Sequence, residues 1–144
     1  MKTDFFKNYQ HKIKNLNQLK ILLKKKNKKV KLVMCHGVFD LVHPGHIRHL
    51  AYAKSKGDIL LVTLTSDVHI KKGIYRPHVP QNLRALNLAA FEMVDYVLID
   101  KNPTPLKNIE IIKPNYFAKG FEYTSKGLPK ATYDELKIVK KYGG

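Results

Sequence analysis

Two histidines at a strand-to-helix transition are the residues of this sequence best suited to chemistry. The apolar run 30–35 predicts a buried strand, and an apolar-periodic segment that begins at Pro44 predicts a helix. His43 and His46 are three residues apart, so both can point from one helical face at the helix start. The first N–H groups of a helix lack intrahelical partners and attract anions, and glycines at 37 and 45 allow close approach of a ligand. The segment therefore predicts a phosphate-binding site.

Metal binding is a second chemistry that this segment could perform, because two more histidines lie near the pair. His36 and His49 flank the pair, so four histidines could hold a metal ion or serve a metal-dependent hydrolase. No cysteine or carboxylate shares the spacing of a known zinc motif, and we expect no protein-bound metal. His49 is expected on the helix surface, and the role of His36 stays undecided.

The elements that must position these histidines alternate between strands and helices. Strands are predicted over 30–35, 58–65, 94–99 and 115–118, and helices over 44–56, 80–92, 103–112 and 132–141. A long turn through 73–77 and a loop over 119–129 interrupt the pattern. Right-handed βαβ crossovers then give an α/β, Rossmann-like, doubly wound parallel sheet with helices on both faces. Ligands of such sheets bind at the C-terminal strand ends, where the histidine segment lies.

The N-terminal segment 1–29 predicts an appended basic helix. Apolar residues recur on one face at 13, 16, 19, 22 and 23, and we expect that face to dock on the core rather than on a membrane surface. Residues 1–31 hold eleven lysines and one acid, Asp4, within a net charge of +16, whereas arginine occurs only at 48, 76 and 84. Such a surplus attracts anionic partners, although a lysine-biased composition alone would also produce it.

Size and composition predict one domain with a single core, because the chain has 144 residues of which 44% are hydrophobic. No apolar run is long enough to span a bilayer and no signal-peptide pattern begins the sequence, so we expect a cytoplasmic protein without membrane contact. The one cysteine, Cys35, lies inside the first strand and is expected to be inert packing.

The histidine segment resembles the GxFD…HxGH signature of the cytidylyltransferase-like nucleotidyltransferases. The matching positions are Gly37, Phe39, Asp40, His43, Gly45 and His46. Further likeness lies in the strand 57–62 with Ser66-Asp67, in Arg76-Pro77 with 80–84, in 94–97, and in the turn 119–123. Within the family the chain is most similar to the adenylyltransferase domain of bifunctional heptose synthases, and more distantly to glycerol-3-phosphate cytidylyltransferases.

The resemblance implies roles for individual residues. The expected catalytic residues are His43, His46, Lys72 and Arg84. The expected nucleotide-binding residues are Gly37, Val38, Phe39, Asp40, Gly45, Lys119, Gly120 and Glu122. The expected substrate-binding residues are Asp67, Lys71 and Arg76. Mg²⁺ is expected to bind through the nucleotide phosphates rather than through the protein.

Several of these positions also have simpler explanations. Lys71 and Lys72 could belong to a solvated turn, and which of them matches the family's lysine is open, because the spacing is shorter here. Asp67 could only initiate a turn, Arg84 could lie on a helix surface, and a glycine at 120 marks a turn without any ligand.

The family pattern continues into a further strand and helix, whereas this sequence stops at Gly144. We therefore expect residues 30–144 to be a nucleotidyltransferase domain that lacks its last strand and helix. The resemblance also implies a sugar kinase, fused or separate, because in the heptose pathway this domain is often joined to one. Family members often form dimers, so a homodimer is open as well.

Three functions follow from these observations. The first is transfer of a nucleoside monophosphate, with AMP favoured, from a nucleoside triphosphate to a heptose-1-phosphate-like sugar phosphate, with release of pyrophosphate. Cytidylyl transfer to glycerol 3-phosphate or a similar polyol phosphate is the variant of this chemistry. The second is a non-catalytic nucleotide- or RNA-binding module, which the basic N-terminal segment favours. The third is the metal-dependent hydrolase.

Overall fold

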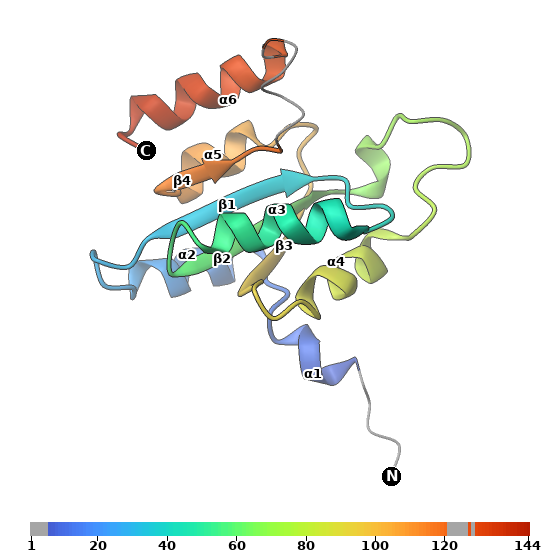
Figure 1. Ribbon diagram of the computed structural model, residues 1–144, viewed down its shortest axis with the longest axis horizontal. Coiled ribbons are helices and arrows are strands. Elements are labelled where there is room, and N and C mark those ends of the chain that lie inside the picture. Colours follow the sequence, from blue (N-terminus) through green and yellow to red (C-terminus); the bar gives the residue numbers. More distant parts are fainter. Residues whose placement is uncertain (1–5, 121–126, 128) are drawn as a thin grey trace.

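Four parallel strands form the centre of the molecule. The computed structural model describes residues 6–120, 127 and 129–144. Its strands are β1 (Leu32–Gly37), β2 (Ile59–Thr65), β3 (Tyr96–Asp100) and β4 (Tyr116–Ala118). They pair in the order β3-β2-β1-β4, so that β1 and β4 meet where the direction of winding reverses (Figure 1). The predicted parallel, doubly wound sheet is confirmed.

The strands form where apolar residues run almost without interruption, as expected for a sheet that is covered on both faces. Val33, Met34 and Cys35 of β1 are fully buried, and so are Leu60 to Leu64 of β2. The first strand begins and ends two residues later than predicted, because its pairing with β2 runs from Leu32 to Gly37. The third also begins later: the backbone N–H of Asp95 donates to Leu60 O before the ladder starts.

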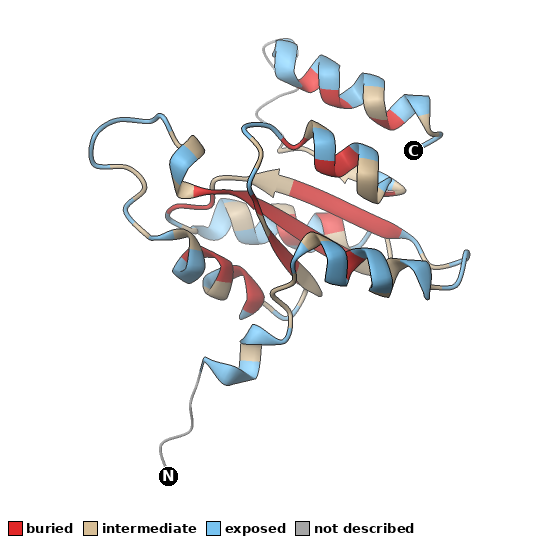
Figure 2. Ribbon diagram, turned by 180° about the vertical axis from the view of Figure 1, so that it is seen from behind, coloured by how far each residue is buried: buried red, intermediate tan, exposed pale blue. Residues whose placement is uncertain are grey.

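Helices cover both faces of the sheet. On one face, α3 (Pro44–Lys54) and α4 (Gln81–Ala89) bury Leu50, Ala53, Ala85 and Leu88. On the other face lie α2 (Leu16–Lys24), α5 (Leu106–Ile112) and α6 (Lys130–Lys141), with Leu19, Ile109 and Val139 in the core. Figure 2 shows the buried residues on the strands and on the inward sides of these helices. The predicted helices exist, although α3 and α4 end two and three residues earlier than predicted.

The expectation of one N-terminal helix is wrong. Residues 6–29 contain two helices, α1 (Lys7–Gln10) and α2, separated by a short extended piece. In that piece Ile13 bridges Val97: Lys14 N–H donates to Val97 O at 2.8 Å, and Val97 N–H donates to Lys12 O at 3.0 Å. The edge strand β3 offers unpaired backbone groups, and satisfying them outweighs continuing the helix.

The N-terminal segment nevertheless docks on the core, as predicted. Asn15 begins α2 with a capping box, accepting from Gln18 N–H while the Gln18 side chain accepts from Asn15 N–H. Leu19 of this helix is fully buried. Cys35 is a free thiol in the core, and burial raises its pKa to about 12, so that it stays an unreactive thiol. In the described part of the chain, no helix is long and apolar enough to cross a membrane.

Candidate functional site

The histidine motif occupies the loop between β1 and α3, at the C-terminal edge of the sheet (Figure 1). His43 is the N-cap of α3, and its Nδ1 accepts from Gly45 N–H at 3.1 Å. The backbone N–H of His43 in turn donates to Nδ1 of His46 at 3.3 Å. The two ring centroids are 4.0 Å apart. The pair is thus a capping box built from imidazoles, which places both rings at the positive end of the helix.

These backbone bonds decide which nitrogen of each ring carries a proton. Because Nδ1 accepts a hydrogen bond in both His43 and His46, the neutral rings carry their proton on Nε2. Each imidazole is therefore set up as an Nε2–H donor. Pre-organised donors of this kind stabilise charge that develops on a phosphate.

Glycines 37 and 45 make room for the rings of the motif itself. A Cβ on Gly45 would lie 2.8 Å from Cε1 of His43, and one on Gly37 would lie 3.0 Å from Cε2 of Phe39. Phe39 is buried, has a φ of 50°, and its ring centroid is 5.5 Å from that of His46. The two glycines, which were expected to let a ligand approach, thus also leave room for ring packing, and the sequence did not reveal this second role.

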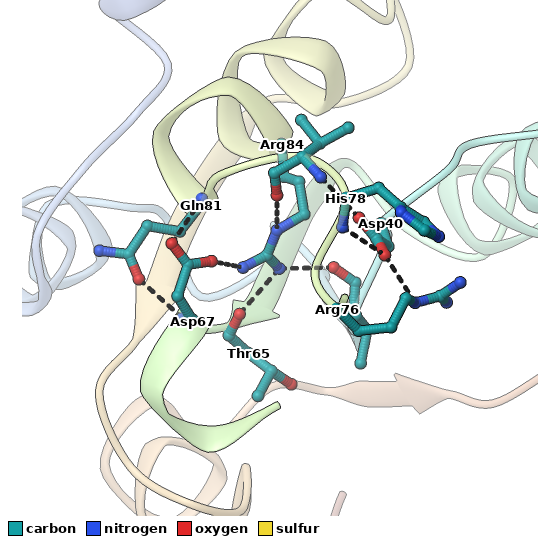
Figure 3. Close-up of polar contacts among 9 residues, drawn as sticks. Asp40, Thr65, Asp67, Arg76, His78, Gln81 and Arg84 are labelled. Carbon is teal, nitrogen blue, oxygen red and sulfur yellow. Dashed lines mark hydrogen bonds and ion pairs between the residues drawn. The ribbon is translucent and has the colours of Figure 1, made fainter. Parts of the chain in front are cut away.

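Asp40 anchors the long loop that follows β2. Its carboxylate is only 5% exposed, accepts from the backbone N–H groups of His78 and Val79 at 3.0 and 2.9 Å, and pairs with Arg76 Nε at 2.9 Å (Figure 3). Burial by itself would raise the pKa of Asp40, but these partners outweigh it and hold the pKa below its ordinary value. Two residues predicted to bind nucleotide and substrate, Asp40 and Arg76, are thus joined in one ion pair.

Arg84 ties the motif loop to the end of β2. The side chain is fully buried, so the alternative of a surface residue is wrong. Its guanidinium donates to the carbonyl oxygens of Val38, Thr65 and Val79 at 2.7 to 2.9 Å, and to the Asp67 carboxylate at 2.5 Å (Figure 3).

Asp67 is also held from a second side. Its backbone N–H donates to Gln81 Oε1, and its carboxylate accepts from Gln81 N–H. The structure therefore brings Arg84 and Asp67 together in a brace between elements, while the predicted phosphate role of Arg84 and substrate role of Asp67 stay predictions.

Lys71 and Lys72 lie elsewhere. The 3₁₀ turn η1 (Asp67–His69) leads into an exposed loop, and both lysines are exposed there. Nothing in this geometry distinguishes one lysine from the other, and both stay predictions.

The end of β4 contributes Lys119 and Gly120. Lys119 Nζ pairs with Glu135 Oε2 of α6 at 2.8 Å and lies 5.7 Å from the Phe117 ring centroid. The predicted nucleotide-binding residue Glu122 lies outside the described residues. Glu135, 4% exposed, was missed by the sequence analysis. Its spacing from Thr132 and Val139 puts it on the buried face of α6, and a lone acid on such a face signals an ion pair.

His36 faces the β2 strand. Its Nδ1 is 2.8 Å from Thr63 Oγ1, and its Nε2 is 3.2 Å from Thr65 Oγ1. Burial lowers the pKa of His36 to about 4, against the opposing influence of Asp100 and with a smaller contribution from Lys119, so the ring is neutral near pH 7. The sequence left this residue undecided because its partners come from another strand.

The alternative of a metal site depends on how closely the possible metal ligands lie. Across residues 6–120, 127 and 129–144, no three His, Cys, Asp or Glu side chains lie close enough together to hold a metal ion. The carboxylates of Asp40 and Asp67 are already engaged by N–H donors and arginines. A Mg²⁺ ion that arrives with nucleotide phosphates stays a prediction.

The cytidylyltransferase-like family model matches residues 34–142, which include the motif, both arginines of Figure 3 and the end of β4. The chain belongs to the cytidylyltransferase-like family. The GxFD…HxGH resemblance predicted this family.

Curated relatives agree with this membership. The chain is 45% identical over 120 residues to the bifunctional protein HldE of Campylobacter jejuni (serotype O:2), covering 82% of this chain and 26% of that protein. It is 41% identical over 128 residues to the bifunctional protein HldE of Campylobacter concisus, covering 88% and 27%. The chain thus spans about a quarter of the length of the curated relatives it matches.

Solved structures match as well. The lipopolysaccharide core biosynthesis protein of Thermoplasma volcanium superposes with a TM-score of 0.64 and 27% identity, covering 79% of this chain and 89% of that one. The pantoate-beta-alanine ligase of Francisella tularensis has a TM-score of 0.56 at 16% identity, covering 90% and 60%, and shows the fold alone.

Proposed function

We propose that this cytidylyltransferase-like protein transfers AMP from ATP to a heptose-1-phosphate-like sugar phosphate and releases pyrophosphate. The observation that carries the proposal is the imidazole pair at the start of α3, whose Nδ1 atoms are committed to backbone N–H groups so that Nε2–H is the donor. The choice of AMP and of a sugar phosphate rests on the similarity to HldE proteins and to the heptose branch of the family.

The reaction needs alignment and charge neutralisation rather than a covalent intermediate. A phosphate oxygen of the acceptor attacks the α-phosphorus of the nucleotide. The new P–O bond forms as the bond from that phosphorus to the bridging β-oxygen breaks, and pyrophosphate leaves with the bonding electrons. In this proposal His43 and His46 donate from Nε2 to the phosphate oxygens on which charge develops, aided by the N–H groups of the first turn of α3.

Other residues complete the proposed site. Lys71 or Lys72 reaches the phosphates from the loop after η1, and Arg76 orders that loop through Asp40. Gly37 to Asp40, Gly45, Lys119, Gly120 and Glu122 border the nucleotide. Mg²⁺, bound through the phosphates, supplies further neutralisation of their charge. A sugar kinase, on the same polypeptide or separate, supplies the sugar phosphate, in keeping with the bifunctional relatives.

The deciding experiment separates the two nucleotides. Calorimetric titration of the chain with ATP and with CTP, each with Mg²⁺, should show micromolar binding of ATP and much weaker binding of CTP. Pyrophosphate release with a heptose 1-phosphate and with glycerol 3-phosphate then identifies the acceptor class. Tight CTP binding with turnover of glycerol 3-phosphate would replace the proposal by the cytidylyltransferase alternative. Binding of neither nucleotide would overturn it.

A further inference from the structure

A cavity of about 540 Å³ lies at the edge of the sheet where the N-terminal segment crosses β3. Its walls come from residues 13–17, from the end of β3 with the loop after it, and from Asn108 of α5. The described residues that line it include neither histidine of the motif nor Lys71, Lys72 or Lys119. Its volume falls in the range of small-molecule sites, so the cavity is a candidate for a second ligand.

The lining selects a small organic anion. Both charged residues in the described lining, Lys14 and Lys101, are cations. The nearby Asp100 carboxylate is fully buried, lies outside this lining and is bonded to Asn102. Leu16 and Leu98 contribute an apolar surface against which a carbon skeleton can lie. Amide side chains complete the walls: Asn15, Asn17, Asn102 and Asn108. Asn15 Oδ1 already accepts from Gln18 N–H and Asn102 Nδ2 already donates to Asp100, so these two offer a ligand their remaining amide atoms. Asn108 is 3% exposed, so its amide is a fixed group rather than a mobile surface one.

One wall of the cavity is bonded to the segment that carries the candidate phosphate-binding lysines. The backbone and side-chain N–H groups of Asn102 both donate to Asp100 Oδ1 at 2.8 Å, and Ser66 N–H donates to the Asp100 carbonyl oxygen at 3.1 Å. His69 Nε2 donates to the Lys101 carbonyl oxygen at 2.9 Å. Ser66 and His69 bracket η1, which leads directly to Lys71 and Lys72. A molecule that contacts 101 and 102 therefore acts on the start of that loop.

We propose that this cavity is a second site, separate from the histidine motif, for a small phosphorylated organic molecule whose binding positions η1 and the loop after it. The phosphate pairs with Lys14 and Lys101, the carbon skeleton packs on Leu16 and Leu98, and its hydrogen-bonding groups meet the asparagine amides. Sugar phosphates and nucleoside monophosphates share this chemistry. The lining shares no residue with the proposed reaction, so binding here can be tested apart from turnover.

The test is a titration of the whole chain followed by ¹⁵N–¹H NMR. AMP and glucose 1-phosphate are the two probes, and inorganic phosphate and adenosine, which are the separate parts of AMP, are the controls. We expect AMP or glucose 1-phosphate to shift the amide resonances of 13–17, of 101–108 and of η1. The probe that binds more tightly shows whether the ligand is a nucleotide or a sugar phosphate. The two controls should bind at least about tenfold more weakly, a difference of about 1.4 kcal/mol. Shifts confined to 37–46 would mean that the probe binds only at the histidine motif, and would overturn the proposal.

Charge-matched variants make the test specific. The pair Lys14→Ser and Lys101→Ser should weaken probe binding at least about tenfold. The control pair Lys20→Ser and Lys107→Ser, two exposed lysines outside the cavity lining, should change it less than about twofold. Equal weakening by both pairs would show a non-specific response to net charge and overturn the site. Shifts at 13–17 without shifts in η1 would overturn the positioning of the loop. Because no turnover is measured, failure of the proposed adenylyl transfer leaves this test unaffected.

Discussion

His43 has two roles that usually belong to different residues. It caps α3 through Nδ1 and, in the proposed reaction, donates to a phosphate oxygen through Nε2. A simple alanine substitution removes both roles and mixes their consequences, whereas asparagine is among the best N-cap residues and has no atom at the Nε2 position.

His43→Asn should therefore lose turnover but keep the helix. Removing one pre-organised donor of developing charge typically costs about 10²- to 10³-fold in kcat, and we expect a loss of that order. The unfolding free energy should fall by less than about 0.5 kcal/mol, against about 1 kcal/mol for His43→Ala. Pyrophosphate release and urea unfolding measure the two quantities. Near-normal turnover of His43→Asn would contradict the assigned donor role.

His36 makes stability depend on pH. Its pKa falls from an ordinary 6.5 to about 4 in the folded protein, so between these values the unfolded chain binds a proton that the folded chain does not. The unfolding free energy of the wild type should therefore decrease as the pH falls from about 6.5 to about 4. His36→Gln lacks this group, and its curve should be flatter over that window in urea titrations at several pH values. Parallel curves for both proteins would refute the attribution to His36.

At the scale of elements, the N-terminal segment is part of the core rather than an appendage. The extended piece around Ile13 pairs with β3, and α2 buries Leu19 against the face that α5 and α6 also cover. Deleting residues 1–29 would consequently expose both the edge strand and this core.

Leu19→Ala should destabilise the whole protein. The side chain is fully buried, and such truncations cost about 2–5 kcal/mol. The matched control is Ile21→Ala in the same helix, whose side chain is 57% exposed and whose loss should cost about 0.5 kcal/mol or less. Chemical unfolding measures both. Equal effects would mean that α2 does not dock as the structure shows.

The loop after η1 is anchored at its far end and exposed at its lysines. Arg76 and the backbone of 78–79 are held by Asp40, so the loop has a defined return point beside the motif. This arrangement allows either Lys71 or Lys72, but not the anchored residues, to adjust to phosphates.

Single substitutions should identify the lysine. Lys71→Ala and Lys72→Ala should differ, with one lowering kcat/KM about 10- to 100-fold through loss of a charge-assisted contact and the other changing it less than about twofold. Steady-state pyrophosphate release checks this. If neither variant is impaired, the solvated-turn explanation holds instead.

For the whole molecule, the fold separates the lysine surplus from the proposed site. In a parallel sheet all strands begin at one edge, so the 24–31 connection into β1 lies at the edge opposite the histidine motif (Figure 1). The six lysines of this connection therefore cannot contact substrate phosphates at the C-terminal edge. Their influence on the reaction is limited by screening over about 10 Å.

Neutralising this edge should separate nucleic-acid affinity from catalysis. Lys24, Lys25, Lys28 and Lys29 are exposed, and changing all four to Gln lowers the charge without removing α2. We expect unchanged pyrophosphate release, and a smaller salt dependence of any RNA binding, because each neutralised phosphate contact contributes to that slope. Filter binding at several salt concentrations measures the second quantity. A large loss of turnover would show that this edge does reach the substrate.

The sequence by itself determined the strands, most helices, the docking face around Leu19 and the position of the histidine motif at a helix start. These features are local, because apolar periodicity, a proline at a helix start and two histidines three residues apart are all written within a few residues. Even the family could be inferred, because its signature lies within ten positions, 37–46.

Only the tertiary structure decided which side chains and segments pair with one another. Arg84 became a buried brace, Asp40 a partner of Arg76 and 78–79, and Lys119 a partner of Glu135, because parallel strand ends and loops from distant parts of the chain meet at one edge. The break after α1 has the same cause, since the free edge of β3 recruits the chain around Ile13. Secondary-structure propensity depends on a residue's own segment. A buried charge or an unpaired strand edge instead finds its hydrogen-bond partners on whichever segment the fold brings beside it.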